Sequence, residues 1–156
     1  MEAAVLSERT RPHTRSRGAR LLVGFAAGAA SVLTVHQGLL FVLNAAGAAP
    51  WPAYSMAPTR PWGVPEVVSA AFWGGVWGAV LGGPMLRTPS RGRWFWGRAM
   101  LLGAVAPTAV GALFLLAGAG KRFSDVSYGV ALVSALIVNG AWGAATASAV
   151  RALRVR

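Results

Sequence analysis

Residues 66–86 read EVVSAAFWGGVWGAVLGGPML, a stretch with one acidic residue at its start and no other charge. As a helix it rises about 31 Å at 1.5 Å per residue, which matches the hydrocarbon core of a bilayer. Its small residues recur every four positions, so they form two adjacent stripes on one side. The stripes are Ala70, Gly74, Gly78 and Gly82, and Gly75, Ala79 and Gly83. Since lipid provides no hydrophobic force between helices, such stripes favour close helix packing within a membrane.

Three further apolar stretches are long enough to cross a bilayer, at about residues 21–49, 94–119 and 126–150. The whole chain is 55% hydrophobic and only 12% charged, and its mean hydropathy is +0.53. Soluble domains carry about 25% charged residues, so lipid is the expected solvent. We therefore predict an all-α membrane protein, with a four-transmembrane-helix bundle over residues 21–150 and the second helix at its centre.

The basic residues predict the orientation of this bundle. The 156-residue chain has 15 Lys and Arg against 4 Asp and Glu, a net charge of +11. Twelve of the 15 lie in residues 1–20, residues 87–98 and residues 151–156, and three lie on the other side, at Arg60, Lys121 and Arg122. Cytoplasmic loops carry the excess of Lys and Arg, so the basic tail (1–20) and the C-terminus (151–156) are expected in the cytoplasm, with the protein in a bacterial inner membrane. Because topology explains the charge, nucleic-acid binding is not expected.

The first apolar stretch has a basic flank and a signal-like Ala46-Gly47-Ala48. A signal-peptide core has about 7–15 apolar residues, and this run is about twice as long, so a retained helix is favoured. The proline-rich loop that follows, residues 50–65, holds five prolines: Pro50, Pro52, Pro58, Pro61 and Pro65. Proline removes backbone donors, so we expect a non-helical cap on the outer side of the bundle.

Several residues are predicted to set how the helices pack. Gly74, Gly78 and Gly82 allow close backbone approach, and Pro107 should kink the third helix. Asn139 is expected nearer the cytoplasm, as an interhelical hydrogen-bonding residue. The same small stripes fit packing within one chain and also fit a homo-oligomer, and both interpretations stay open.

Polar residues within a membrane are costly and often functional. A cluster of them is expected in the outer half of the bilayer, under the proline-rich loop: His36, Gln37, Asn44, Tyr54, Ser55 and Glu66. A His beside a carboxylate can relay protons or bind a cation or polar head group. The alternative is structural, with His36 and Gln37 bonding across helices and Glu66 complementing the dipole of its own helix.

Four short motifs carry a resemblance: HQG (36–38), YSMAP (54–58), GVP (63–65) and AFWGGVWG (71–78). Together they resemble an uncharacterised family of small bacterial multi-pass membrane proteins with HQG, YSMxP, GVP and AFWGGxWG motifs, over about residues 20–120. The resemblance implies a membrane protein and no particular activity.

These observations favour a non-enzymatic inner-membrane protein that binds a partner, a lipid or a small solute at the outer cluster. The first alternative is an oligomeric transporter or channel subunit, and the second is a lipid-acting enzyme with His36 as base. The chain has no Cys and only two His, and no metal-ligand or phosphate-loop spacing is present, so neither cofactor nor metal is expected. No catalytic residues are assigned. The lipid bilayer is the one partner expected under all three interpretations.

Overall fold

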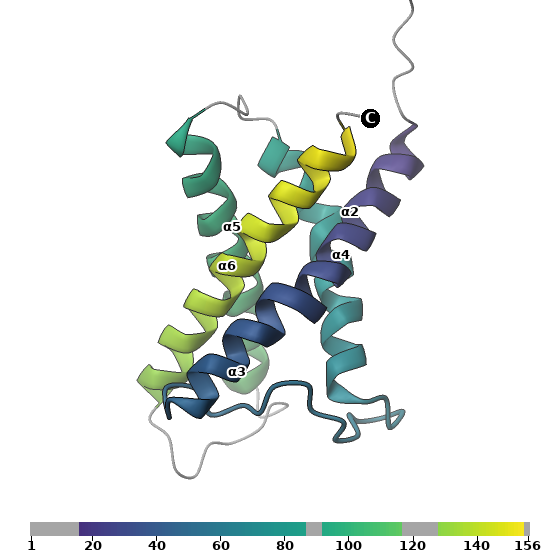
Figure 1. Cartoon of the computed structure of the whole chain (residues 1–156). Coiled ribbons are helices and arrows are strands. Elements are labelled where there is room, and N and C mark those ends of the chain that lie inside the picture. Colours follow the sequence, from purple (N-terminus) through teal and green to yellow (C-terminus); the bar gives the residue numbers. More distant parts are fainter. Residues whose placement is uncertain (1–15, 87–91, 117–127, 155–156) are drawn as a thin grey trace, which may run out of the picture.

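The structure, a computed structural model, describes residues 16–86, 92–116 and 128–154. Within them the regular structure is helical, and it forms four rods (Figure 1). The first rod joins α2 (Arg17–Ser31), a π-helical turn η1 (Val32–His36) and α3 (Gln37–Ala45). The others are α4 (Glu66–Leu86), α5 (Arg93–Leu116) and α6 (Tyr128–Arg154).

Three helix ends differ from the sequence prediction, and one of them is the end of the first rod, which lies at Ala45 and not at about residue 49. The first helix begins at Arg17, four residues before the apolar run, because the Ser16 hydroxyl accepts the Ala19 N–H at 3.2 Å and caps it. The last helix continues to Arg154. Helices run past the apolar core of a bilayer because charged side chains extend to its surface. Arg17 and Arg20, which were expected in the basic tail (1–20), therefore belong to α2, and residues 1–15 lie outside the described residues.

Three helices are long and apolar enough to cross a membrane: Arg17–Ala45, Arg93–Phe114 and Tyr128–Leu153. This length and composition indicate a membrane protein. Among the described residues, helix α4 is not in this set. Its glycines make close contacts with α2.

Helices α2 and α4 cross at a contact between backbones. A Cβ placed on Gly24 would lie 2.6 Å from the Gly78 carbonyl oxygen, and one on Gly78 would lie 2.8 Å from the Gly28 Cα. Gly74 faces Gly28 in the same way. Gly82, at the edge of this crossing, would place a Cβ 3.8 Å from the Gly24 Cα, an ordinary contact. Only glycine permits the central approach.

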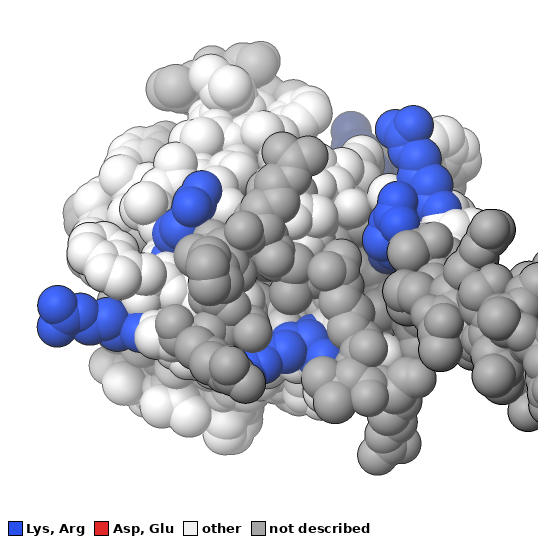
Figure 2. Space-filling view, turned by 90° about the horizontal axis from the view of Figure 1, so that it is seen from above, with Lys and Arg blue, Asp and Glu red and all other residues white. Residues whose placement is uncertain are grey.

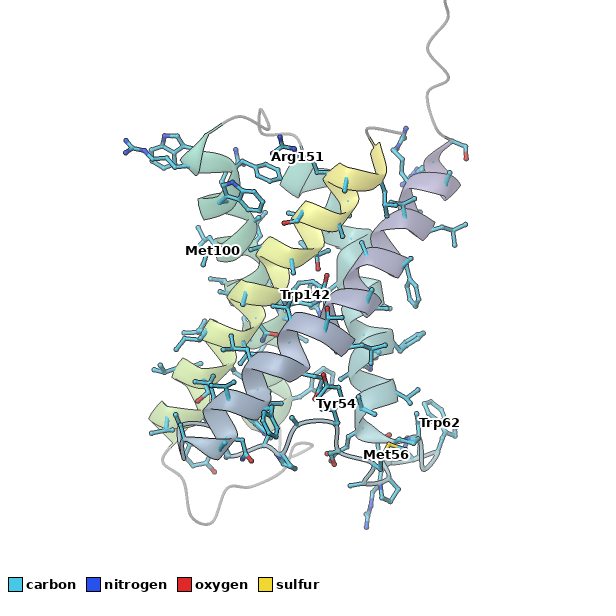
Figure 3. The ribbon with its side chains drawn as sticks, in the orientation of Figure 1. Tyr54, Met56, Trp62, Met100, Trp142 and Arg151 are labelled. Atoms are coloured by element: carbon cyan, nitrogen blue, oxygen red, sulfur yellow. The ribbon has the colours of Figure 1, made fainter. Side chains whose placement is uncertain are left out.

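Helices α5 and α6 form a second pair of the same kind. A Cβ on Gly103 would lie 2.6 Å from the Gly143 Cα and 2.7 Å from the Asn139 carbonyl oxygen. The two pairs meet at Trp142 of α6, whose indole N–H donates to the Gly28 carbonyl at 2.9 Å and which lies between the helices in Figure 3.

The expected central position of the second helix is not what the structure shows. Helix α4 contacts every other rod but packs mainly on α2, whereas α6 packs extensively on both α5 and the first rod. Small residues spaced by four define a packing face, and the face on α4 packs against one helix, α2. The large buried side chain of Trp142 makes α6 the helix that joins the pairs.

Both ends of the described chain lie at one end of the molecule, together with the last turn of α4 and the first turn of α5 (Figure 1). Basic side chains gather there, and among described residues no acidic one accompanies them (Figure 2). They come from the start of α2, the first two turns of α5 and the end of α6: Arg17, Arg20, Arg93, Arg98 and Arg151. Arg151 also stacks over the Phe95 ring, 5.8 Å from its centroid.

The chain between α3 and α4 crosses the opposite end and includes the proline-rich loop (Figure 1). It is non-helical, as predicted. The Asn44 amide donates to the Ala49 carbonyl at 3.0 Å, and the Ser134 hydroxyl donates to the Ala48 carbonyl. These bonds tie the loop to α3 and to α6.

Candidate functional site

The site begins with an irregular turn in the first rod. In η1, Val32–His36, the helix widens to i→i+5 hydrogen bonding, which inserts an extra residue into the turn. Such turns expose backbone carbonyls to other partners, and they recur at functional sites. Here the Tyr54 hydroxyl donates to the Leu33 carbonyl at 3.0 Å. The turn also sets where His36 and Gln37 lie.

Gln37 holds the proline-rich loop over this turn. Its buried side-chain oxygen accepts the Tyr54 backbone N–H at 2.6 Å. Tyr54 has φ 52°, a left-handed conformation that a bulky residue rarely adopts. Such a conformation costs about 1–3 kcal/mol, so the two bonds that Tyr54 makes hold it there. Tyr54 therefore fixes the loop to both η1 and α3.

Under the loop is a partly open cavity of about 280 Å³, which we call the loop cavity. The first rod, the loop, α4 and α6 all contribute to its wall. Its polar lining consists of His36, Gln37, Ser55, Glu66 and Asn139, and its apolar lining includes Leu40, Trp51 and Val138. Side chains distant in sequence thus converge on one space.

A second cavity of about 210 Å³, the tryptophan cavity, shares His36, Ala70 and Asn139 with the first. The rest of its wall comes from α4, α5 and α6 and from the first rod, and half of these residues are tryptophans: Trp73, Trp77, Trp142, Pro107, Val32 and Gly74. Trp73 is 57% exposed, so this cavity reaches the surface of the helices. The two cavities adjoin at His36 and Asn139.

Two polar groups mark this junction. The buried Nδ1 of His36 has no hydrogen-bond partner within the described part of the chain. The Asn139 amide nitrogen donates to the Thr108 hydroxyl at 2.9 Å, which links α6 to α5. A buried polar atom without a partner costs about 1–3 kcal/mol, so a bound group or a water at the junction would be stabilised there.

The structure brings four of the six residues of the predicted cluster to one cavity: His36, Gln37, Ser55 and Glu66. Tyr54 bonds to Gln37 and to the Leu33 carbonyl, and Asn44 bonds to Ala49, so both fix the loop. Of the predicted packing residues, Pro107 and Gly74 line the tryptophan cavity and Asn139 lines both cavities.

The places of four residues were not foreseen from the sequence. Asn139 was expected nearer the cytoplasm and lies instead beside His36, at the junction of the cavities. Trp73 and Trp77, one turn apart on α4, and Trp142 on α6 were not assigned to a site. Tryptophans within an apolar run, away from its ends, were the signal available, because such residues usually lie at membrane interfaces.

Across residues 16–86, 92–116 and 128–154, no group of three or more His, Asp or Glu side chains is placed to hold a metal ion. What the cavities offer is a carboxylate, amides, a hydroxyl, an imidazole and indole rings. These groups bind by hydrogen bonds and by aromatic contact.

Comparisons with protein-family models, with curated proteins and with solved structures found no match for this chain. The resemblance to the family with HQG, YSMxP, GVP and AFWGGxWG motifs therefore stays a prediction. Fold and composition define the class, a helical protein with three helices able to cross a membrane.

Proposed function

We propose that the chain is an integral membrane protein whose four rods all cross the bilayer, with both ends in the cytoplasm of a bacterium. The 21 residues of α4 span about 31 Å at 1.5 Å per residue, which is enough to cross. In the sequence, the twelve-to-three distribution of Lys and Arg between the two sides of the predicted topology supports the orientation. Exposed tryptophans also lie at the two ends, with Trp62 on the loop and Trp94 at the start of α5.

Within the bilayer, the protein binds an amphipathic membrane molecule without chemically changing it. One observation carries this proposal: a cavity with polar side chains near the loop adjoins an aromatic cavity that lies deeper and reaches the surface of the helices. A lipid-like molecule has a polar head and an apolar chain, and it would present them in this order to a protein in a bilayer. The ligand would enter sideways, beside Trp73.

The test blocks the cavities at a residue that lines both. Ala70→Phe introduces a large side chain at their junction, and Ala30→Phe makes the same change at an exposed position on α2. Both variants and the wild type are purified in lipid nanodiscs, and the bound molecules are identified by native mass spectrometry. We expect the wild type and Ala30→Phe to retain a stoichiometric amphiphile that Ala70→Phe loses. Equal retention by Ala70→Phe would refute the binding site.

A transporter or channel subunit is the second candidate, because the adjoining cavities extend from the loop to Pro107 in the interior of α5. Beyond them, towards the basic end, lie the fully buried Phe95, Ala99 and Ala147. Transport would need these helices to move apart. Solute flux into proteoliposomes that is abolished by Ala70→Phe would favour this candidate over simple binding.

A further inference from the structure

One hydrogen-bond donor in the wall of the loop cavity has a defined orientation. The side chain of Gln37 is only 4% exposed, and its oxygen accepts the Tyr54 backbone N–H at 2.6 Å. Only the oxygen of an amide accepts hydrogen bonds, so this bond fixes which way the amide faces. The nitrogen of the same amide carries two N–H donors, and it takes no part in that bond.

This nitrogen and a nitrogen of His36 both open onto the loop cavity. Neither the Gln37 nitrogen nor His36 Nε2 makes a hydrogen bond within the described part of the chain. Among the side-chain nitrogens and oxygens described, those that are both enclosed and unpartnered are Nδ1 of His36 and Oγ1 of Thr146. The Gln37 nitrogen and His36 Nε2 are therefore not enclosed, and both side chains line the loop cavity.

The two nitrogens favour a ligand that accepts hydrogen bonds. A neutral imidazole carries one N–H and one bare nitrogen. In proteins a buried N–H that lacks an acceptor is rarer than a buried carbonyl that lacks a donor, and the same preference places the imidazole proton on Nε2 and not on the unpartnered Nδ1. Gln37 and His36 then both donate into the cavity. Asn139 bonds to the Thr108 hydroxyl, which both donates and accepts, so its amide suits either kind of ligand atom.

The tryptophan cavity favours a planar ring. Its wall includes the indoles of Trp73, Trp77 and Trp142, and the last is held in place by its bond to the Gly28 carbonyl. Aromatic rings in contact gain about 0.5–1.5 kcal/mol beyond the burial of their area, whereas an acyl chain gains the burial alone. Because His36 lines both cavities, a ring among the indoles has an edge beside the imidazole.

We infer that the two cavities bind an isoprenoid quinone, a planar ring whose polar atoms accept hydrogen bonds and do not donate them, with a long apolar tail. This inference rests on the proposed function and names its ligand class. The carbonyl oxygens of the ring accept from the Gln37 amide and from His36, and the ring lies along the indoles. The tail leaves beside Trp73, which is 57% exposed.

The test measures which amphiphile the full chain retains. Nanodiscs of phosphatidylcholine contain equal small amounts of an isoprenyl benzoquinone, an isoprenyl alcohol with the same tail and phosphatidylethanolamine, and the retained molecules are read by native mass spectrometry. A ring contact and a hydrogen bond together predict about a tenfold preference for the quinone over the alcohol, which lacks the ring. Equal retention of all three, or preference for the alcohol or the phospholipid, would overturn the quinone inference. The proposed function would still stand if Ala70→Phe abolished that retention.

Two variants separate the ring contact from the hydrogen bonds. Trp77→Leu removes an indole from the wall and should lower quinone retention about fivefold, whereas Trp94→Leu, at an exposed residue that lines neither cavity, should not change it. His36→Phe keeps an aromatic ring but removes its N–H, and it should lower retention about fivefold. Thr34→Val is its control, because Thr34 is exposed on the same turn and lines neither cavity. Full retention by both cavity variants would contradict the proposed contacts.

Reduction of the quinone tests the donors without a mutation, so it decides even if the variants do not fold. Two electrons and two protons convert the two carbonyls into hydroxyls, and the ring and tail are kept. The hydroxyl hydrogens need acceptors, which the donors of Gln37 and His36 do not provide. The wild type should therefore retain the quinone about fivefold more than the quinol. Equal or stronger retention of the quinol would overturn the role of these two donors and the choice of a quinone.

Discussion

A methyl group added at Gly78 would meet the backbone of the opposite helix. The Cβ would lie 2.8 Å from the Gly28 Cα, and it would also face the Gly24 carbonyl oxygen. Carbon atoms pack at about 3.5–4.0 Å, so α2 and α4 would have to separate by about 0.7–1.2 Å at their crossing. Backbone atoms have no alternative rotamer, so this shift cannot be absorbed locally.

The expected cost of Gly78→Ala is about 1–3 kcal/mol, the usual penalty for overpacking a closely packed contact. Alanine gains about 1 kcal/mol of helix propensity over glycine, which offsets part of it. Gly83→Ala is the control on the same helix, because its Cβ would meet nothing within 4 Å. Thermal unfolding in detergent should place Gly78→Ala several degrees below the wild type, at about 2–4 °C per kcal/mol.

Gly83→Ala should unfold at or slightly above the wild-type temperature. If both variants unfold together with the wild type, the close crossing of α2 and α4 is not present in the folded protein. If Gly83→Ala falls as far as Gly78→Ala, the loss reflects glycine in general and not the contact with Gly28.

Three further outcomes are expected. Trp142→Phe removes the bond to the Gly28 carbonyl and some buried volume, so it should lower the free energy of unfolding by about 2–3 kcal/mol; an unchanged value would contradict the junction between the pairs. Tyr54→Phe removes the bond to the Leu33 carbonyl, so hydrogen exchange in the proline-rich loop should rise about tenfold; unaltered protection would show that the hydroxyl does not hold the loop. Because the chain has no Cys, single cysteines placed before the first helix and after the last can be labelled selectively. A membrane-impermeant maleimide should reach both only from the cytoplasmic side, and opposite sidedness would refute the topology.

Much of the fold was predictable from the lengths of the apolar runs. The stretch 66–86 matches α4 residue for residue, because a proline and a charge define its start. Other helix ends moved by a few residues, since the cap at Ser16 and the basic ends extend helices beyond their apolar core. Which helices pair with each other was harder to predict from the sequence. The four-residue spacing of Gly24 and Gly28 predicts a packing face, but it does not predict which helix packs against that face.

The candidate site could be predicted only in part. His36, Gln37 and Glu66 stand out as polar residues near the ends of apolar runs, and the loop between the first two helices brings them together. The π-helical turn leaves no sequence signature, because it depends on a carbonyl being satisfied from the distant Tyr54. Asn139 lies far along the chain, and its place beside His36 depends on the crossing of α6 over the first rod.

The two glycine crossings have a mechanical consequence. Each pair of helices is held by backbone against backbone, with little freedom to slide, whereas the pairs meet through side chains such as Trp142. Thermal fluctuations should therefore be largest at the interface between the two helix pairs, α2 with α4 and α5 with α6. His36 on the first rod and Asn139 on α6 both line the cavities between the two pairs, so a molecule bound there would hold the pairs together.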